Sequence, residues 1–527
     1  MNNRNARGTR RAVLCVFVII AVACVVMPAC GERPRGAKNV ILFIGDGMGP
    51  QAMGLAMMYA RNAPHSTVPG RRLNLEKLLN EGVTGVALTH PAGFIVADSS
   101  SSATQIATGK KSLPGYVGLD AEGNAVETIL EKAKRHGKST GLVSDTRITH
   151  ATPASFAAHI RSRGMEAAIA DDLLRTQPDV MLSGGLRYWL PADVNDSRST
   201  AYAAVREILP SGFEIRSGRT DSHDCVESAR KLGYAVAFTR DDMNRGAPER
   251  LLGLFAPSEL PDAITVRKTM SDPGRRIPTL SEMARRAIEL LSVSEEGFFL
   301  MVEAGQIDWA AHCNDAGRLL HEMLVFDDTL GRLLEWVSRR NDTLLIVMSD
   351  HETGGFGFSY STCDSPGKKS ADGAYSPKWN YGRYEVLDKL YAQSSSLYEL
   401  LLRFHGLPAR ERTAERFMNS FNSSVRFPIN LHQARRIIGD EPGACRDVAG
   451  TARIGGFDEF YTNSLDAQCA LIARAIAGRQ GVVWGSGTHT STPVLVVAYG
   501  PHELTRAFRG VHHTTDIHRL INEAMDW

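Results

Sequence analysis

The sequence has little cysteine, no excess of charge of either sign, and no apolar run long enough to cross a bilayer. Its 527 residues include 60 Lys and Arg against 58 Asp and Glu, a net charge of +2. Because this gives no basic excess for a phosphate backbone, we expect no nucleic-acid binding. Eight cysteines are too few for a disulfide-rich scaffold of this length. The 43% of hydrophobic residues, with 48 Gly and 23 Pro, excludes a collagen-like or wholly disordered chain.

The N-terminal segment has the pattern of a secretion signal. Residues 1–11 carry four arginines and no acid, and the apolar run Ala12–Met27 follows them. This run of about 16 residues is shorter than the ~20 that a membrane-spanning helix needs, so we predict a signal peptide over residues 1–29. Cys30 follows the small residue Ala29, which resembles a bacterial lipoprotein signal. We therefore expect an exported protein, periplasmic or at the cell surface, with Cys30 as its lipidated first residue; ordinary cleavage nearby is the alternative.

Removal of this leader changes the charge and the cysteine count. Residues 1–29 contain four arginines and two cysteines, so the net charge becomes −2. If Cys30 is lipidated, it is the expected link to a membrane, and five cysteines remain. They are Cys225, Cys313, Cys363, Cys445 and Cys469. An odd number leaves at least one thiol unpaired, and Cys445 and Cys469 are the nearest candidates for a pair.

Short apolar runs alternate with helical patterns along the chain. Continuous apolar runs are typical of strands that are covered on both faces of a parallel sheet. The expected strands are Val40–Ile44, Thr140–Ser144, Val180–Leu182, Phe298–Val302, Leu344–Met348 and Val494–Ala498. The expected helices are Leu73–Leu79, Thr128–Arg135, Leu280–Leu291 and Ala316–Val337. The alternation predicts an α/β three-layer sandwich, in which helices flank a large, mostly parallel sheet.

One stretch does not follow this alternation. Residues 364–480 contain Ser/Gly-rich and aromatic pieces and helical patterns, without comparable buried strands. We therefore expect one large α/β domain formed by residues 30–363 and 481–527, with residues 364–480 inserted between two late strands.

Carboxylates and imidazoles follow several of the expected strands. They are Asp46, Glu303, Asp308, His312, Asp350 and His351, and His489 stands just before the last strand. In α/β sheets such side chains collect at one edge, where ligands bind. Oxygen and nitrogen ligands suit zinc, and harder oxygen sites suit magnesium. Asp308 and His312 are four residues apart and share one helix face, although a surface ion pair is the commoner outcome for such a pair alone.

A serine-rich run, Val96–Thr104, provides a candidate nucleophile. It is preceded by apolar Phe94–Val96 and followed by Ala103–Thr108, which suits a helix. A strand-turn-helix arrangement would place the serines at a helix N-terminus, where an anion is favoured. A nearby metal would activate such a hydroxyl. A flexible serine-rich linker is the alternative.

At this point the sequence resembles the alkaline phosphatase family. Val96–Thr104 fits the active-site pattern of that family at every position. Other similar segments, in the order of the family, include NVILFIGDGMG, THATPASFAAHIRSR, GFFLMVEAGQIDWAAH, SDHETGGF and GTHTSTPVLVVAYGP. The resemblance covers roughly residues 37–358 and 482–527.

The resemblance implies a role for each matching residue. Ser99 is expected to be the nucleophile that becomes phosphoserine, with Arg163 holding two phosphate oxygens and Asp98 holding that arginine. Two Zn²⁺ ions and one Mg²⁺ ion are expected. The first zinc, which activates water and stabilises the leaving group, would be bound by Asp308, His312 and His489. The second zinc, which activates Ser99, would be bound by Asp46, Asp350 and His351. The magnesium would be bound by Asp46, Thr152 and Glu303.

Some positions near the expected phosphate site need comment. His150 stands where the best-known bacterial branch has Asp, and Trp309 where that branch has Lys and the animal branch has His. We expect His150 to form hydrogen bonds behind the metal ligands rather than to bind a metal. Thr152 as N-cap and Pro153 at the first helical position would start a helix that carries Arg163 about three turns on. Arg161 is near, and only the resemblance selects Arg163.

The resemblance implies hydrolysis of small phosphate monoesters to an alcohol and inorganic phosphate, by a protein that is commonly a homodimer in this family. Two alternatives remain. One is another activity of the superfamily. A phosphodiesterase would typically lack the third-ion ligands, but Thr152 and Glu303 are present, and a sulfatase would have a Pro-x-Arg signature, which is absent after Ser99. The other is a non-catalytic lipoprotein that binds phosphate or metal, which a missing nucleophile or ligand would favour; none is missing.

Overall fold

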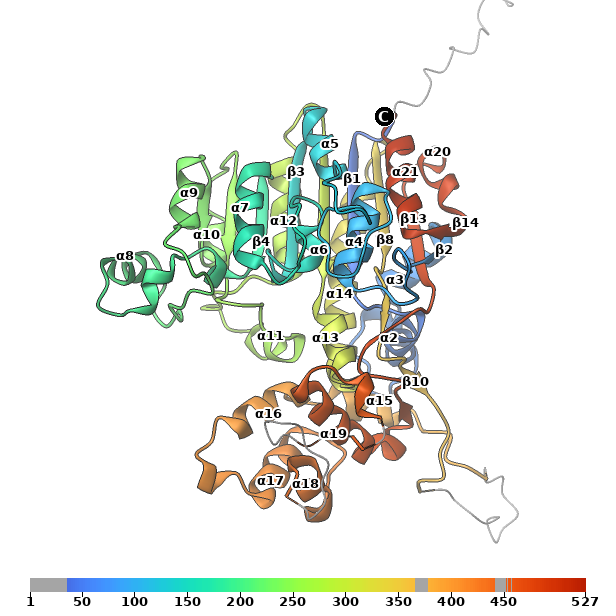
Figure 1. The fold of residues 1–527 in the computed structure, drawn as a ribbon. Coiled ribbons are helices and arrows are strands. Elements are labelled where there is room, and N and C mark those ends of the chain that lie inside the picture. Colours follow the sequence, from blue (N-terminus) through green and yellow to red (C-terminus); the bar gives the residue numbers. More distant parts are fainter. Residues whose placement is uncertain (1–35, 365–377, 441–451, 453, 456) are drawn as a thin grey trace, which may run out of the picture.

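A computed structural model of the protein describes residues 36–364, 378–440, 452, 454, 455 and 457–527. The expected signal peptide, Cys30 and Cys445 lie outside these residues. The described chain forms a central sheet with helices on both faces and a helical segment below one end of the sheet (Figure 1). This is the expected α/β three-layer fold. Among the described residues, no helix combines the length and apolar character needed to cross a membrane.

The central sheet has ten strands in the order β14-β2-β13-β8-β1-β7-β3-β4-β6-β5. Their bounds are β1 (Asn39–Gly45), β2 (Val83–Leu88), β3 (Ser139–Arg147), β4 (Val180–Gly184), β5 (Ala235–Ala237), β6 (Leu251–Leu254), β7 (Phe298–Ala304), β8 (Thr343–Met348), β13 (Val494–Tyr499) and β14 (Gly510–His513). Each of the expected strands is present, extended by a residue or more at one or both ends.

The direction of β13 corrects the sequence-based expectation. It pairs antiparallel with both β8 and β2, and it alone runs against the other described strands of this sheet. The chain reaches β13 from β12 (His489–Thr490), which pairs with β9 (Glu352–Thr353) just beyond the carboxyl end of β8. The strand therefore has to start at the edge where its parallel neighbours end. This reversal brings His489 to that edge.

Both faces of the sheet are covered because the strand side chains alternate between two cores. In β1, Ile41 and Phe43 belong to one core, and Val40, Leu42 and Ile44 to the other. The first core is closed by α2 (Pro50–Asn62), α3 (Asn74–Glu81), α12 (Leu280–Leu291) and α14 (Ala316–Val337). The second is closed by α4 (Ser99–Thr108), α5 (Ile129–Arg135), α7 (Glu166–Thr176) and α21 (Thr514–Ala524). All four expected helices are among these, and α12 and α14 have the predicted bounds.

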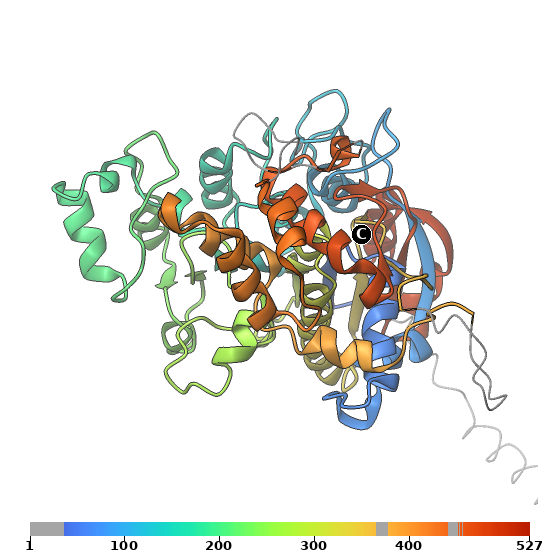
Figure 2. The ribbon, with the colours of Figure 1, turned by 90° about the horizontal axis from the view of Figure 1, so that it is seen from below.

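A helical segment lies between β10 (Gly357–Phe358) and β11 (Val482–Val483), which pair antiparallel. It contains α15 (Glu385–Tyr391), α16 (Leu397–His405), α17 (Ala414–Ser424), α18 (Leu431–Ile438) and α19 (Ser464–Gln480). Seen from below, these orange helices lie in front of the sheet (Figure 2). The segment lies beside α13 (Gln306–His312), the helix that carries Asp308 and His312 (Figure 1).

Two local expectations are wrong. Residues 94–96 form an exposed loop rather than a strand, because their side chains do not reach either core. The helix at Thr152 is only α6 (Ala151–Ala154), with His150 at its N-cap, so Arg163 lies on the loop beyond it. Cys469 is a buried free thiol that is hydrogen-bonded to the thiol of Cys313, while Cys445, its candidate partner, lies outside the described residues.

Candidate active site

The candidate nucleophile lies at the first residue of a ten-residue helix. Asp98 is the N-cap of α4, and its Oδ1 accepts a hydrogen bond of 3.0 Å from the backbone N–H of Ser101. Ser99 follows it, is buried, and has its Oγ 3.2 Å from Nε2 of His351. The free N–H groups and the dipole of α4 therefore favour negative charge next to the Ser99 hydroxyl.

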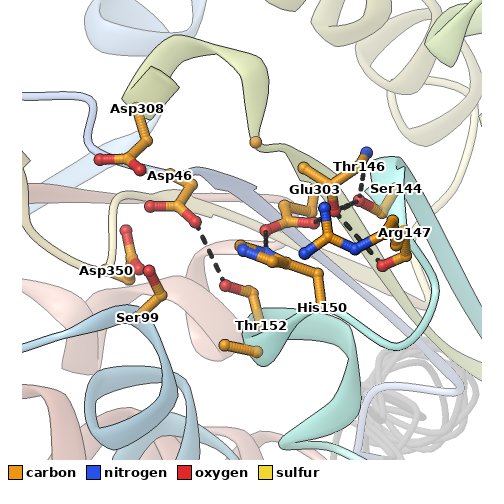
Figure 3. Close-up of polar contacts among 12 residues, drawn as sticks. Asp46, Ser99, Ser144, Thr146, Arg147, His150, Thr152, Glu303, Asp308 and Asp350 are labelled. Atoms are coloured by element: carbon orange, nitrogen blue, oxygen red, sulfur yellow. Dashed lines mark hydrogen bonds and ion pairs between the residues drawn. The ribbon is translucent and has the colours of Figure 1, made fainter. Parts of the chain in front are cut away.

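Three carboxylates lie beside this serine because three adjacent parallel strands end in register. Ile44 pairs with both Glu303 and Met348, so Asp46, Glu303 and Asp350 meet at one edge (Figure 3). Gly47 allows α13 to approach, since its φ is +70° and an added Cβ would lie 2.7 Å from the Cα of Asp308. The sheet thus gathers side chains from distant parts of the sequence.

Asp308, His312 and His489 form one group of converging atoms. Nε2 of His312 lies 3.1 Å from Oδ2 of Asp308 and 3.1 Å from Nε2 of His489. The Nδ1 atoms of the two histidines donate to backbone carbonyls, at 2.7 Å to Gly487 and 2.8 Å to Ala97. In their neutral form, both rings present Nε2 lone pairs to each other and to a carboxylate, an arrangement that suits a shared cation.

A second group surrounds His351. Its buried Nε2 lies 3.2 Å from Oδ2 of Asp350 and 3.5 Å from Oδ1 of Asp46. Burial and the nearby carboxylates raise the pKa of Asp46 well above its usual value, and burial and Asp308 raise the pKa of Asp350 to about 8. So many buried carboxylates resist ionisation together unless positive charge is placed among them.

A third group lies on the other side of Asp46, toward β3. Thr152 donates to Oδ2 of Asp46 at 3.3 Å, and Ser144 and Thr146 both donate to Oε2 of Glu303. Figure 3 shows Thr152 and His150 between Asp46 and the two hydroxyl residues Ser144 and Thr146. Among the described residues, the buried atoms Asp46 Oδ1, Glu303 Oε1, Asp350 Oδ2 and His150 Nδ1 have no hydrogen-bond partner. The three orphaned carboxylate oxygens fit a site that holds cations.

Ser144 and Thr146 were not identified from the sequence. They lie in β3, whose other positions are mostly apolar and buried, and they point toward Glu303. The available signal was the alternation of two hydroxyl residues at the carboxyl end of an otherwise apolar strand. Thr353, which donates to Oδ1 of Asp308 at 2.5 Å, was missed as well.

Arg163 reaches the site from its loop. Its backbone N–H donates to Gly115 O at 2.8 Å, and its Nη1 lies 3.1 Å from Oδ2 of Asp98. Burial alone would raise the pKa of Asp98, but Arg163 and the serine hydrogen bonds hold it well below its usual value. The side chain of Arg163 is 30% exposed, so its guanidinium is open to an incoming anion.

His150 and Trp309 form the wall next to this arginine. Nη2 of Arg163 donates to Nε2 of His150 at 3.1 Å, and the His150 ring meets the edge of Trp309 with centroids 5.7 Å apart. Burial and then Arg163 lower the pKa of His150 well below its usual value. Arg147 stacks over Trp309 at 5.8 Å. The structure thus brings all the sequence-predicted site residues to one region of the sheet edge.

Comparisons with known proteins identify the family of the chain. The family model described as alkaline phosphatase matches residues 37–408. Alkaline phosphatase 3 of Bacillus subtilis is 31% identical over 517 residues, and the match covers 97% of this chain and 95% of that protein. Alkaline phosphatase 4 of the same organism is 28% identical over 496 residues, and the match covers 92% of this chain and 88% of that protein. The crystal structure of Thermus thermophilus alkaline phosphatase superposes with a TM-score of 0.74 at 28% identity, covering 95% of this chain and 94% of that one. The expectation of an enzyme of the phosphoric monoester hydrolase class is confirmed by these relatives. The chain belongs to the alkaline phosphatase family.

Proposed function

We propose that this protein hydrolyses phosphate monoesters to an alcohol and inorganic phosphate through a phosphoserine at Ser99. The observation that carries the proposal is the placement of the Ser99 hydroxyl. It lies 3.2 Å from Nε2 of His351, at the N-terminus of α4, beside buried carboxylates and the Arg163 guanidinium. A nucleophile, an anion-binding helix end and a planar cation are the parts that phosphoryl transfer requires.

The donor atoms support two Zn²⁺ ions and one Mg²⁺ ion. Asp308, His312 and His489 supply mixed nitrogen and oxygen donors, as do Asp46, Asp350 and His351, and such sets suit zinc. Asp46, Thr152 and Glu303 supply oxygens only, which suits magnesium. When bound, these cations supply positive charge that favours the ionised hydroxyl of Ser99 and neutralises the developing charge on the phosphoryl oxygens.

The residues of the chain then act in two displacements. The Ser99 oxygen attacks phosphorus, the bond to the ester oxygen breaks, and the alcohol leaves with a proton from solvent. Water next attacks the phosphoserine, the Ser99–phosphorus bond breaks, and inorganic phosphate is released. Two in-line displacements retain the configuration at phosphorus. Arg163 binds two phosphate oxygens throughout, because its fork matches their spacing and Asp98 holds it in place.

His150 supports this arginine rather than a metal. A guanidinium only donates hydrogen bonds, so Nε2 of His150 must accept from Arg163. The neutral ring then carries its proton on Nδ1, which faces Oε1 of Glu303 at 4.0 Å. A protonated nitrogen cannot bind a metal ion, so we assign His150 to positioning Arg163.

A cavity of about 850 Å³ next to His312 is a candidate site for the alcohol part of the substrate. It is lined by Arg147 and Trp309 of the α/β domain and by Tyr398 and Leu402 of α16. If the alcohol binds there, Tyr398→Ala raises KM for aromatic esters several-fold while KM for small alkyl phosphates is unchanged. Equal changes for both substrates would contradict this assignment.

The assay of the main proposal compares p-nitrophenyl phosphate with bis-p-nitrophenyl phosphate at alkaline pH, with and without a chelator given time to strip bound metal. We expect monoester preference, loss of activity in chelator and in Ser99→Ala, and radiolabelled phosphate trapped on Ser99 after acid quenching. Ser112→Ala, which removes a buried hydroxyl bonded to Leu119 O, is the matched control. Diester preference would favour a phosphodiesterase, full activity in Ser99→Ala would exclude the phosphoserine, and activity in neither assay would favour a phosphate-binding protein.

The proposed catalytic domain consists of residues 30–363 and 481–527, and residues 364–480 form the insertion. The proposed export signal is cleaved before Cys30, which becomes the lipidated first residue. The described chain starts beside the last helix, where Ala37 N–H donates to Ala524 O, at the end of the sheet opposite the candidate site. Cys30→Ala should move the enzyme from the membrane to the soluble fraction, and an unchanged distribution would contradict the anchor.

The homodimer, which the family resemblance suggests, is tested by sedimentation.

A further inference from the structure

A second group of metal-binding side chains lies far along the sheet from the candidate active site. Asp171 belongs to α7, Cys225 is the first residue of α9 (Cys225–Lys231), and His223 lies just before that helix. These helices cover the edge near β4, β6 and β5, whereas the active-site residues follow β1, β7 and β8. Figure 1 shows α9 and α7 to the left of α4 and α13. The proposed phosphatase chemistry does not use these residues.

The three donor atoms lie at the spacing of a tetrahedral site. Nδ1 of His223 is 2.9 Å from Oδ1 of Asp171, Sγ of Cys225 is 3.3 Å from the same oxygen, and Sγ is 3.7 Å from Nδ1. Zinc bonds of about 2.0 Å to oxygen and nitrogen and about 2.3 Å to sulfur imply ligand–ligand edges of about 3.3–3.6 Å in a tetrahedron. The observed distances bracket this range, so an ion fits after small side-chain shifts.

The hydrogen bonds around His223 leave a lone pair facing into this group. Ser228 donates its hydroxyl proton to Asp224 O at 2.9 Å, so its oxygen accepts from Nε2 of His223, also at 2.9 Å. The neutral ring then has its lone pair on Nδ1, which faces the carboxylate oxygen of Asp171. Two acceptors 2.9 Å apart need positive charge between them, which either a proton on Nδ1 or a bound metal ion supplies. A hydrogen bond that fixes the far nitrogen of a ligating histidine is also the usual arrangement behind a metal site.

Arg219 holds the other two donors in place. Its side chain is 1% exposed, and it donates from Nη2 to Oδ2 of Asp171 at 3.1 Å and from Nη1 to Sγ of Cys225 at 3.2 Å. Burial raises the pKa of the Cys225 thiol and Arg219 partly offsets this shift; Oδ1 of Asp171, which accepts from that thiol at 3.3 Å, becomes available to an ion once the thiol proton leaves. Asp221 accepts from the same guanidinium and offsets its charge. The His223 and Asp171 side chains are 44% and 29% exposed, so an ion can enter from solvent.

We propose that Asp171, His223 and Cys225 bind one zinc ion, with water as the fourth ligand. The mixed sulfur, nitrogen and oxygen donors suit zinc better than magnesium or calcium. On binding, the Cys225 thiol transfers its proton to solvent and the sulfur becomes the ligand. The ion would tie α7 to the start of α9, after an irregular stretch over residues 210–224. It is a structural site, separate from the catalytic ions.

Cobalt substitution tests the site directly on the full-length protein. The metals are removed with a chelator under reducing conditions, and Co²⁺ is added back. The proposed catalytic ligands are nitrogen and oxygen only, so a sulfur-to-cobalt charge-transfer band in the near ultraviolet reports a thiolate ligand. We expect the band in the wild type and in Cys363→Ser, a more accessible thiol used as control, and its loss in Cys225→Ser. No band, or a band that persists in Cys225→Ser, would overturn the proposal.

Zinc content gives a second, independent measurement. His223→Ala changes an exposed side chain and should fold, but should weaken zinc binding at this site at least tenfold, as loss of a ligand or its supporting contact does. The purified variant should then contain one zinc ion fewer per chain, with phosphatase activity retained. His65→Ala, another exposed histidine with a carboxylate partner, is the matched control. Equal zinc content in wild type and His223→Ala would overturn the site, whatever the outcome of the phosphatase assay.

Discussion

His150 accepts a hydrogen bond of 3.1 Å from Arg163, and this contact links the candidate phosphate site to the Glu303 group. His150 is buried at the N-cap of the short helix α6, while Arg163 lies on a loop thirteen residues further along the chain. Asp98 holds the other side of the same guanidinium. Arg163 is thus fixed from two sides, which prepares it to bind two phosphate oxygens without reordering.

His150→Ala should release one side of Arg163. We expect KM for p-nitrophenyl phosphate to rise about tenfold, with a smaller fall in kcat, because Asp98 still holds the arginine. Steady-state kinetics and competitive inhibition by inorganic phosphate measure both effects. A large fall in kcat at unchanged KM would instead show that His150 acts on the metal ligands or the chemical step.

Thr152→Val should weaken the third cation site while keeping the shape of the side chain. Thr152 donates to Asp46 at 3.3 Å and supplies one of three oxygen donors, so its loss leaves Asp46 and Glu303 alone. We expect activity to fall at micromolar Mg²⁺ and to recover at millimolar Mg²⁺. Thr149→Val is a control at a neighbouring buried threonine that bonds Glu166 instead. A variant whose activity ignores magnesium would exclude this role.

Glu166→Ala should destabilise the domain by breaking a largely buried ion pair. Glu166 accepts two hydrogen bonds from Arg147, at 2.9 and 3.0 Å. The Arg147 side chain is 14% exposed and the Glu166 side chain 9%. The loss should cost up to about 3 kcal/mol of unfolding free energy, because the largely buried Arg147 then keeps only Glu259, 3.3 Å away, to offset its charge. Urea denaturation measures the change. Glu127→Ala, at the exposed pair with Arg135, should leave the midpoint unchanged.

His321 should make stability depend on pH in the acidic range. It lies in α14, donates to Tyr391 O at 2.9 Å, and burial followed by Arg267 lowers its pKa to about 4. The unfolded chain, with a histidine pKa of about 6.5, binds this proton first, so folding stability is present above pH ~6.5 and is lost as pH falls toward 4. The full loss is ~3 kcal/mol. Urea denaturation across this range should show a steeper decline for wild type than for His321→Gln, and parallel curves would contradict the assignment.

The elements of the fold were largely predictable from the sequence, whereas the site was only partly so. The apolar runs at β1, β7 and β8 mark strands because each is covered on both faces. Asp308 and His312 share a helix face by spacing alone. The loop position of Arg163 was not predictable, since α6 stops after four residues and the helix pattern beyond it is overridden by the bridge between Val117 and Ile160.

Local patterns reveal local structure, because burial and backbone hydrogen bonding repeat with the period of a strand or helix. The sequence by itself determined the α/β alternation, the helices α12 and α14, and the serine at the start of α4. Only the tertiary structure decided which side chains meet. The reversal of β13 brings His489 to Asp308, β3 carries Ser144 to Glu303, and α7 meets α9 so that Asp171 reaches Cys225. These contacts join residues that are more than fifty positions apart, and their distances depend on chain topology rather than on any local period.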